Sequence, residues 1–239
     1  MFENLFRNLT PITRNIIILN VIVFALSNLA FPKMYELFSA FFPTSPFFKS
    51  WQIITHMFMH GGIMHIAFNM LTFASFGPVL ERFLGDKKFL FLYFLSGLGA
   101  FALFNLWEYY QIYRDAQPLI AEGLKMSDLL VGNFDKVPVR LEENGQNIIN
   151  ILSTPMVGAS GALFGVVAAF TVLYPDAEMY IMFIPFPIKA KILLPIVIVG
   201  SVFLGINNYG GIAHFAHIGG AIVGFVLIKI WGRNRYRIN

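Results

Sequence analysis

Residues 155–170, PMVGASGALFGVVAAF, place Ser160 between two glycines, Gly158 and Gly161, at the head of a long apolar run. A serine there could be a helix cap, a packing residue or a nucleophile. A lone G-x-S-G is a weak signal, because it more often marks a turn or a helix entry. The elbow of soluble α/β-hydrolases contains a similar motif, but it needs a preceding strand that is not visible here. The rest of the chain must decide between these interpretations.

The composition indicates a polytopic membrane protein. Of the 239 residues, 57% are hydrophobic and only 13% are charged, whereas an average soluble domain has about 25% charged residues. The mean hydropathy is +0.67. The absence of cysteine excludes a disulfide framework and thiolate chemistry. The net charge of +4 could suggest nucleic acid, but the basic residues lie mostly beside apolar runs, as membrane topology requires, so no nucleic-acid partner is expected.

Apolar runs predict six membrane spans in one membrane domain covering residues 1–239, with an all-α fold. The first span should remain uncleaved, because a signal peptide would have a shorter core and a small-residue cleavage site. The fifth span is short and lies near the lower limit for crossing a bilayer. The predicted spans are about 12–31, 63–83, 88–107, 156–174, 190–206 and 212–231.

Lysine and arginine predict the orientation of these spans. One side of the membrane receives 11 of the 17 basic residues, and the richer side should be cytoplasmic, so both termini are expected inside. The basic residues on the expected inner side are Arg7, Arg14, Arg82, Lys87, Lys88, Lys189, Lys191, Lys229, Arg233, Arg235 and Arg237. Those on the expected outer side are Lys33, Lys49, Arg114, Lys125, Lys136 and Arg140.

Two long connections are expected outside. Residues 32–62 mix aromatic residues with proline and lysine, which suggests a segment lying in the interface, with Trp51 as an anchor. Residues 108–155 carry most of the acidic groups and could form either a small extramembrane element or a flexible loop, to which the sequence assigns no function.

Polar residues recur at matched depth in three of the spans. The second span contains His65 and Asn69, the fourth begins near Ser160, and the sixth contains His217. These three spans all run from outside to inside, so their first turns lie near the outer face, about 3–8 Å below the span starts. Intramembrane polar residues are costly and usually line a working site. The shared depth therefore indicates one site.

Small residues predict that the fourth and sixth spans pack closely. Gly161 and Gly165 form a G-x-x-x-G, and Gly220 and Gly224 form another directly after His217. Such spacings let helix backbones approach each other in lipid. The packing would bring Ser160 and His217 within hydrogen-bond reach.

These residue types fit acyl transfer. A serine needs a base to take its proton, and His217 is the best-placed candidate. His65 and Asn69 lie four residues apart on one helix face and both offer N–H donors for an oxyanion, which the backbone N–H of Ser160 could join. No Asp or Glu lies at this depth, so the prediction is a Ser–His dyad.

Each residue also has a structural interpretation. His65, Asn69 or His217 alone could be hydrogen-bonding groups between helices. Zinc bound by His56, His60 and His65, or by His214 and His217, is the chemical rival, but the H-E-x-x-H pattern is absent, and no metal or cofactor is expected. His56 and His60 are interpreted as structural groups that bond loop carbonyls, and the role of His214 stays open.

The motifs HGGIMHIAFN, GASG and AHIGGAIVG, in this order on alternate spans, resemble those of the rhomboid intramembrane serine proteases. The resemblance implies a six-helix bundle with a water-filled cavity open to the outside. It implies Ser160 as nucleophile, His217 as base, and His65 and Asn69 as oxyanion stabilisers. It also implies an aromatic residue, here Phe164, stacked on the catalytic histidine.

The resemblance further implies cleavage of transmembrane substrates near their outer ends, after a small residue, with movement of the fifth span and of the cap over the cavity. The sequence departs from the family in two places. Gln52 follows Trp51 where many members have arginine, and Glu81 is followed by Arg82 and Phe83 where the family often has Glu-x-Arg. Glu81 and Arg82 are expected to be structural.

The leading functional hypothesis is a serine endopeptidase in a bacterial inner membrane, with its site open to the outside. Its partners would be single-span or polytopic membrane proteins and the lipid bilayer. The alternative is a catalytically inactive relative that binds membrane clients, although such relatives typically lose the serine or the histidine. A transporter should instead carry polar groups near the midplane or along a through-path.

Overall fold

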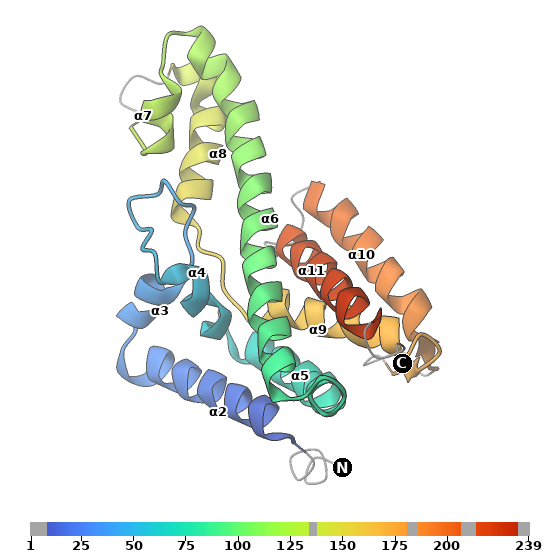
Figure 1. The fold of residues 1–239 in the computed structure, drawn as a ribbon. Coiled ribbons are helices and arrows are strands. Elements are labelled where there is room, and N and C mark those ends of the chain that lie inside the picture. Colours follow the sequence, from blue (N-terminus) through green and yellow to red (C-terminus); the bar gives the residue numbers. More distant parts are fainter. Residues whose placement is uncertain (1–8, 134–137, 181–185, 207–213, 234–239) are drawn as a thin grey trace.

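The computed structural model describes residues 9–133, 138–180, 186–206 and 214–233, which form a helical bundle with one short hairpin (Figure 1). The elements are α2 (Pro11–Ala25), α3 (Lys33–Phe38), α4 (Gln52–Thr55), α5 (Ile63–Leu84), α6 (Asp86–Ala121), α7 (Met126–Leu130), α8 (Glu142–Ser153), α9 (Ser160–Leu173), β1 (Glu178–Met179), β2 (Ile188–Lys189), α10 (Ala190–Ile206) and α11 (His214–Arg233).

Each predicted span corresponds to a helix. Four helices among the described residues are long and apolar enough to cross a membrane, the first of them extended by a π-helical turn, Leu26–Ala30; α9 and α10 are apolar but shorter. The count of six crossings therefore stays a prediction. The fourth helix begins at Ser160, four residues later than predicted. The predicted start of the sixth span at residue 212 lies outside the described residues, as do Arg7, Lys136, Arg235 and Arg237.

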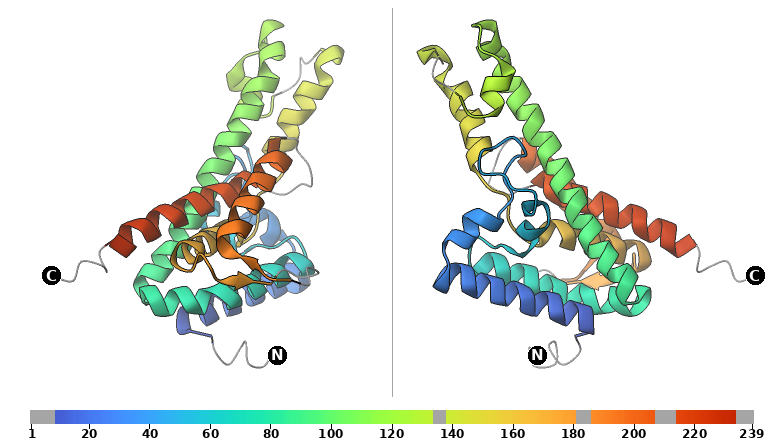
Figure 2. Two further views of the ribbon diagram at one scale, coloured as in Figure 1. Left: turned by 90° about the vertical axis from the view of Figure 1, so that its right-hand side faces the viewer. Right: turned by 60° about the vertical axis from the view of Figure 1, so that its left-hand side comes forward.

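The third helix is much longer than its predicted span. α6 contains 36 residues and continues to Ala121, so it is about 54 Å long, against a hydrocarbon core of about 30 Å. Of the two interpretations of residues 108–155, the described part is an ordered helical element and not a flexible loop. Figure 2 shows the second half of α6 and α8 rising together from the body of the bundle.

We call the described part of residues 108–153 the outer helical unit. It has a hydrophobic core of its own, and the preceding connection is bound to it: Thr44 donates to the Leu130 carbonyl and Ser45 to the Leu152 carbonyl, both at 2.6 Å. The buried residues of this core are Phe42, Ile112, Ala116, Leu119, Leu129, Ile148 and Leu152.

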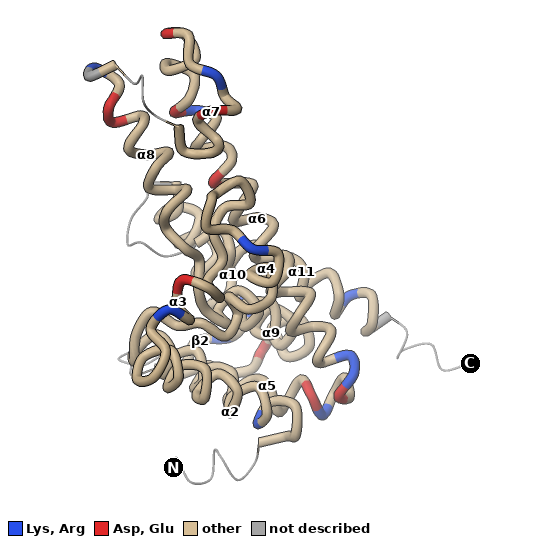
Figure 3. Tube along the Cα trace, turned by 90° about the vertical axis from the view of Figure 1, so that its left-hand side faces the viewer, with Lys and Arg blue, Asp and Glu red and all other residues tan. Residues whose placement is uncertain are grey.

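Charged residues gather mainly near the ends of the helices. Figure 3 shows them around α7 and the start of α8, where α5 joins α6, at α3 and beside α4, whereas the middle parts of α2 and α5 carry almost none. This distribution matches a bundle whose middle faces lipid, because charged side chains are costly in hydrocarbon.

The carboxylate of Glu81 joins the first two membrane helices. Glu81 lies near the end of α5, is buried, and accepts four hydrogen bonds from the start of α2. The donors are Thr10 Oγ1 at 2.5 Å, the Ile12 amide at 2.9 Å, and the amide and hydroxyl of Thr13, both at 2.8 Å. The first amides of a helix lack internal partners, and a negative charge there is favourable. The expected structural role of Glu81 is thereby explained.

Replacing Glu81 with alanine should lower the free energy of unfolding by about 2–4 kcal/mol, because it leaves the buried donors of α2 without an acceptor. Unfolding in detergent micelles, followed by circular dichroism, measures this loss. Glu178→Ala, at an exposed position of β1, is the control and should change stability by less than about 0.5 kcal/mol. Equal losses in both variants would contradict the role of Glu81.

Candidate active site

Gly158 shapes the entry to α9. Its φ of +116° lies in a region that favours glycine, and its amide donates to the carbonyl of His56 at 3.0 Å. A Cβ atom at this position would lie 2.7 Å from Nε2 of His65. Both the backbone conformation and the close approach therefore require glycine at position 158. The helix begins two residues later, at Ser160.

Ser160 and His217 are in hydrogen-bond contact. The Oγ of Ser160 lies 2.9 Å from Nε2 of His217, which comes from the first turn of α11. Phe164, one turn after Ser160, stacks on the imidazole with ring centroids 4.2 Å apart and an angle of 4° between the rings. His214 lies edge-on to His217, with its ring centroid 6.4 Å away. No carboxylate among the described residues makes a hydrogen bond to His217.

Glycine contacts between α9 and α11 bring this pair together. A Cβ atom at Gly220 would overlap the carbonyl oxygen of Gly161, and one at Gly224 would overlap the backbone of Gly165. A Cβ atom at Gly219 would likewise lie too close to the carbonyl oxygen of Gly99 in α6. The backbones of three helices thus touch directly beside the site, as the G-x-x-x-G spacing predicts.

His65 and Asn69 converge on the same point from α5. The Gly61 amide donates to Nδ1 of His65 at 3.4 Å, which leaves the ring proton of a neutral His65 on Nε2, the atom that faces Gly158. Nδ2 of Asn69 also faces Gly158, is buried, and has no partner among the described residues. Two N–H donors therefore point into the site.

The first connection holds the segment before Ser160 in place. Ala40 pairs with Met156 through two backbone hydrogen bonds, of 3.0 and 2.7 Å, in an isolated antiparallel bridge. Gln52 is fully buried and takes the place of the family's arginine. Its amide group donates to two carbonyls at 3.2 and 3.1 Å and accepts from two amides at 3.4 and 3.1 Å. A neutral side chain therefore organises this loop.

His56 and His60 lie in this connection and not in the catalytic pair. The Nδ1 of His56 donates to the Gln52 carbonyl at 2.8 Å, which confirms its structural interpretation. His60 instead packs edge-on against His65, with ring centroids 5.0 Å apart. Burial lowers the pKa of both rings to about 4, and for His60 the neighbouring His65 contributes.

These buried imidazoles predict acid sensitivity. In the unfolded chain a histidine has a pKa near 6.5, so the unfolded state binds the proton more tightly than the folded state. The stability that neutral His56 provides is complete above pH 6.5 and is lost as the pH falls towards 4, in total about 3 kcal/mol. Thermal unfolding between pH 7.5 and 4 measures the loss. His56→Asn, which keeps a donor but cannot titrate, should make the loss between pH 7.5 and 4 smaller, and the remaining loss comes from His60. An unchanged profile would contradict this assignment.

A single cavity of about 1580 Å³ contains the polar groups. It is lined by His65, Asn69, Ser160 and His217, by apolar residues of α10, and by residues of the outer helical unit. The contribution of the outer helical unit, including Glu108, was not expected from the sequence. The helical spacing of Ile112, Ala116 and Leu119, at four and three residues, is the signal that could have extended the third helix. Among the described residues, no three His, Asp or Glu side chains are grouped so that they could hold a metal ion.

Apolar helices around a partly buried Ser–His contact define a polytopic integral membrane protein with a polar site inside the bundle. A family model described as the Rhomboid domain matches residues 48–234, and the chain belongs to this family.

Named relatives agree with this assignment. The chain is 29% identical over 210 residues to "Rhomboid protein 1, mitochondrial" of Saccharomyces cerevisiae, which covers 86% of this chain and 49% of that protein. It is 30% identical over 181 residues to "Rhomboid protease AarA" of Providencia stuartii, and the match covers 74% of this chain and 54% of that protein. It is 26% identical to "RHOMBOID-like protein 4" of Arabidopsis thaliana, and the match covers 75% of this chain and 33% of that protein. The chain therefore spans about a third to a half of the length of these relatives.

Proposed function

We propose that this protein is an intramembrane serine endopeptidase that cleaves transmembrane proteins near the outer face of the membrane. The observation that carries the proposal is the 2.9 Å contact between Ser160 Oγ and His217 Nε2 inside a cavity of a membrane bundle. A relative that its name describes as a rhomboid protease supports the same activity. The site offers a nucleophile, a base and donors for an oxyanion.

The first step forms an acyl-enzyme. Ser160 Oγ attacks the carbonyl carbon of the scissile peptide bond while His217 Nε2 accepts the hydroxyl proton. Phe164 covers one face of the imidazole, which restricts the ring to the orientation that faces Ser160. His217 then gives the proton to the leaving amine, and the C–N bond breaks.

The negative charge on the carbonyl oxygen needs donors that are already in place. His65 Nε2–H and Asn69 Nδ2–H point towards Gly158, and the backbone N–H of Ser160, at the first position of α9, has no partner within its helix. Donors that are aligned before the reaction stabilise the transition state without reorganisation. The Nδ2 atom of Asn69 has no hydrogen-bond partner in the described part of the chain, which is the expected condition of such a donor before substrate binds.

Water completes the cycle. His217 accepts a proton from a water molecule that attacks the acyl-enzyme, and it returns this proton to Ser160 Oγ as the ester bond breaks. The cavity is large enough for both a substrate strand and water, since one water occupies about 30 Å³.

A transmembrane substrate can reach this cavity from the side. The cavity is lined by Phe68, Thr72 and Phe76 of α5 and by Leu193 and Val197 of α10, and these two helices are not packed tightly against each other. This side of the cavity would face lipid in the proposed orientation, with both termini in the cytoplasm and the site near the outer face of a bacterial inner membrane.

Labelling with a fluorophosphonate probe tests the proposal. The probe reacts with activated serine hydroxyls, so the wild-type protein in detergent should be labelled and Ser160→Ala should not. An unlabelled wild-type protein would favour the alternative, a catalytically inactive relative that binds membrane clients.

Asn69→Ala should reduce kcat by about 10²–10³-fold, because it removes one oxyanion donor while the Ser160–His217 contact persists. Initial rates on a transmembrane substrate in liposomes measure the loss. Ser75→Ala, at an exposed position of the same helix, is the matched control and should retain wild-type activity. A kcat equal to that of the wild type would remove Asn69 from this role.

A further inference from the structure

One face of α6 continues the wall of the active-site cavity beyond the catalytic pair. Phe104, Trp107, Glu108 and Gln111 line the cavity and follow each other at the three- and four-residue spacing of a single helix face. The neighbouring face of α6 packs against α8 in the core of the outer helical unit. Polar groups of this unit therefore face the same space as Ser160.

One carboxylate oxygen of Glu108 in this wall has no hydrogen-bond partner among the described residues. Its Oε2 atom is shielded from water and makes no hydrogen bond to any described residue. Arg114, the nearest basic residue along α6, is occupied by two hydrogen bonds to Asp115, of 2.9 and 3.0 Å. A shielded carboxylate oxygen without a hydrogen bond is unfavourable, and a positive charge offsets this cost better than a neutral donor.

The height of Glu108 above the catalytic pair can be estimated along α6. Ala100 lies against Gly161, next to Ser160, and Glu108 comes eight residues later, about 12 Å further along the helix. An extended strand covers this distance with about four residues, at roughly 3.3 Å each. Glu108 is thus within reach of a substrate residue about four positions outward from the scissile bond.

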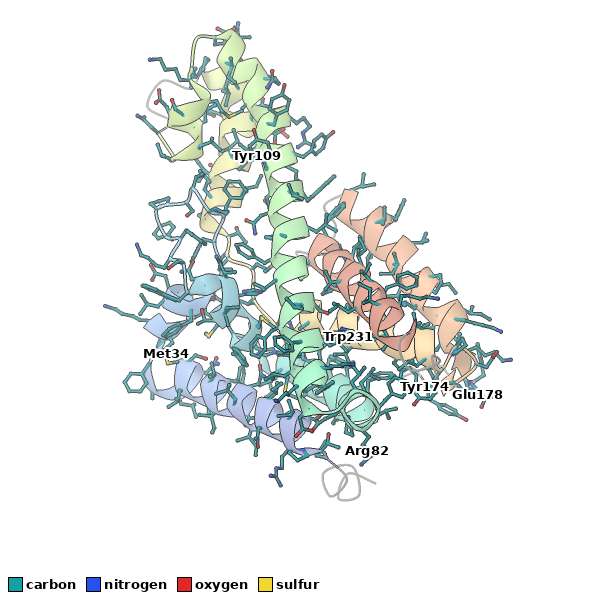
Figure 4. All side chains as sticks on the ribbon, in the orientation of Figure 1. Met34, Arg82, Tyr109, Tyr174, Glu178 and Trp231 are labelled. Atoms are coloured by element: carbon teal, nitrogen blue, oxygen red, sulfur yellow. The ribbon has the colours of Figure 1, made fainter. Side chains whose placement is uncertain are left out.

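The outer surface of α6 shows where the membrane ends. Tyr109, Tyr110 and Tyr113 are about half exposed on this helix, and tyrosines of this kind gather at membrane–water interfaces. Figure 4 shows Tyr109 in the upper half of α6, at the opposite end of the molecule from Arg82. A substrate strand passing Glu108 would therefore be leaving the hydrocarbon, where a basic side chain is tolerated.

We infer that Glu108, with Gln111 beside it, is a specificity subsite that binds a lysine or arginine side chain of the substrate about four residues outward from the cleaved bond. The ammonium or guanidinium group pairs with the carboxylate, and the amide oxygen of Gln111 can accept a further hydrogen bond. This inference rests on the proposed function, because it assigns the substrate strand to the cavity of Ser160.

The test measures binding in the Ser160→Ala background, so that it does not depend on catalysis. The probes are transmembrane peptides with an alanine-rich outer end, in which one lysine is moved through six successive positions. Matched peptides carry glutamine or glutamate at the same positions. One position should bind at least about tenfold more tightly with lysine than with glutamine, in the range of close interfacial charge pairs.

Charge exchange distinguishes recognition from a structural effect. Glu108→Gln should remove the preference for lysine, and Glu108→Lys should reverse it in favour of the glutamate peptide, which a misfolded variant could not do. Glu143→Gln, an exposed acid of α8 outside the cavity lining, is the matched control and should keep the wild-type ranking.

A lysine preference that persists in Glu108→Lys, or binding that is independent of the lysine position, would overturn the inference. Failure of the protease proposal appears separately, as absent fluorophosphonate labelling at Ser160. A charge exchange observed together with absent labelling would support the subsite and contradict the activity.

Discussion

Replacing Ser160 or His217 with alanine is expected to lower kcat/KM for a transmembrane substrate by on the order of 10⁵-fold, while the protein still folds. Either change removes one partner of the 2.9 Å Oγ–Nε2 contact, and a hydroxyl without its base is a weak nucleophile. Single-turnover cleavage in liposomes, with product detected by mass spectrometry, measures the loss over this range.

The two changes should not be additive. Nucleophile and base act as one unit, so the double variant should be about as slow as either single variant. Ser153→Ala, at an exposed position of α8, is the control for loss of a hydroxyl and should cleave at the wild-type rate. A Ser160→Ala protein that retains activity would refute the proposed chemistry, and losses that multiply in the double variant would refute the paired role.

Gly220→Val should have the second-largest effect, on both stability and activity. Any side chain at this position meets the carbonyl oxygen of Gly161, so α11 must move away from α9 and carry His217 with it. Overpacking of this kind costs about 1–3 kcal/mol or more. A shift of about 1 Å in a catalytic group reduces the rate by roughly 10²-fold. Thermal unfolding and cleavage rate, measured on the same preparation, should both fall.

Gly232→Val is a matched control for this variant. Gly232 lies near the end of the same helix, and a Cβ atom added there meets nothing within 4 Å. It should leave stability and rate near their wild-type values. If Gly220→Val matched this control, the close approach of α9 and α11 would not be what positions His217.

Much of the architecture could be predicted because a bilayer imposes simple rules on sequence. Long apolar runs are needed to cross it, and the predicted second span, residues 63–83, coincides with α5 to within one residue. Polar residues are rare inside it, so Ser160 and His217 stand out without any structure. The glycine spacings also indicated which two helices would touch.

The length of the third helix, α6, could not be predicted from hydropathy. Residues 108–121 are rich in polar groups, so hydropathy ended the span at 107, but the backbone remains helical for 14 residues more. The helix is stabilised by packing against α8, which lies about 30 residues further along the chain. Packing between distant segments is visible in each sequence only as a weak helical spacing of apolar residues.

Gln52 shows the same limit at a single residue. Gln52 departs from the family pattern, and its buried amide makes four hydrogen bonds within the first connection. An amide carries both donors and acceptors, so it can bond carbonyl and amide groups of a loop at once. Which of these groups surround it is decided by the fold of the loop.

The sequence by itself determined the class of protein, the approximate spans and the candidate residues, because composition, run length and spacing along a helix are local properties. Only the tertiary structure decided the distance between Ser160 and His217 and the left-handed turn at Gly158 that brings the helix entry against His65. It also decided that Glu108 lies in the cavity wall, where its Oε2 atom has no hydrogen-bond partner among the described residues. These features depend on which backbones from distant parts of the chain touch, and close packing fixes such contacts to fractions of an ångström.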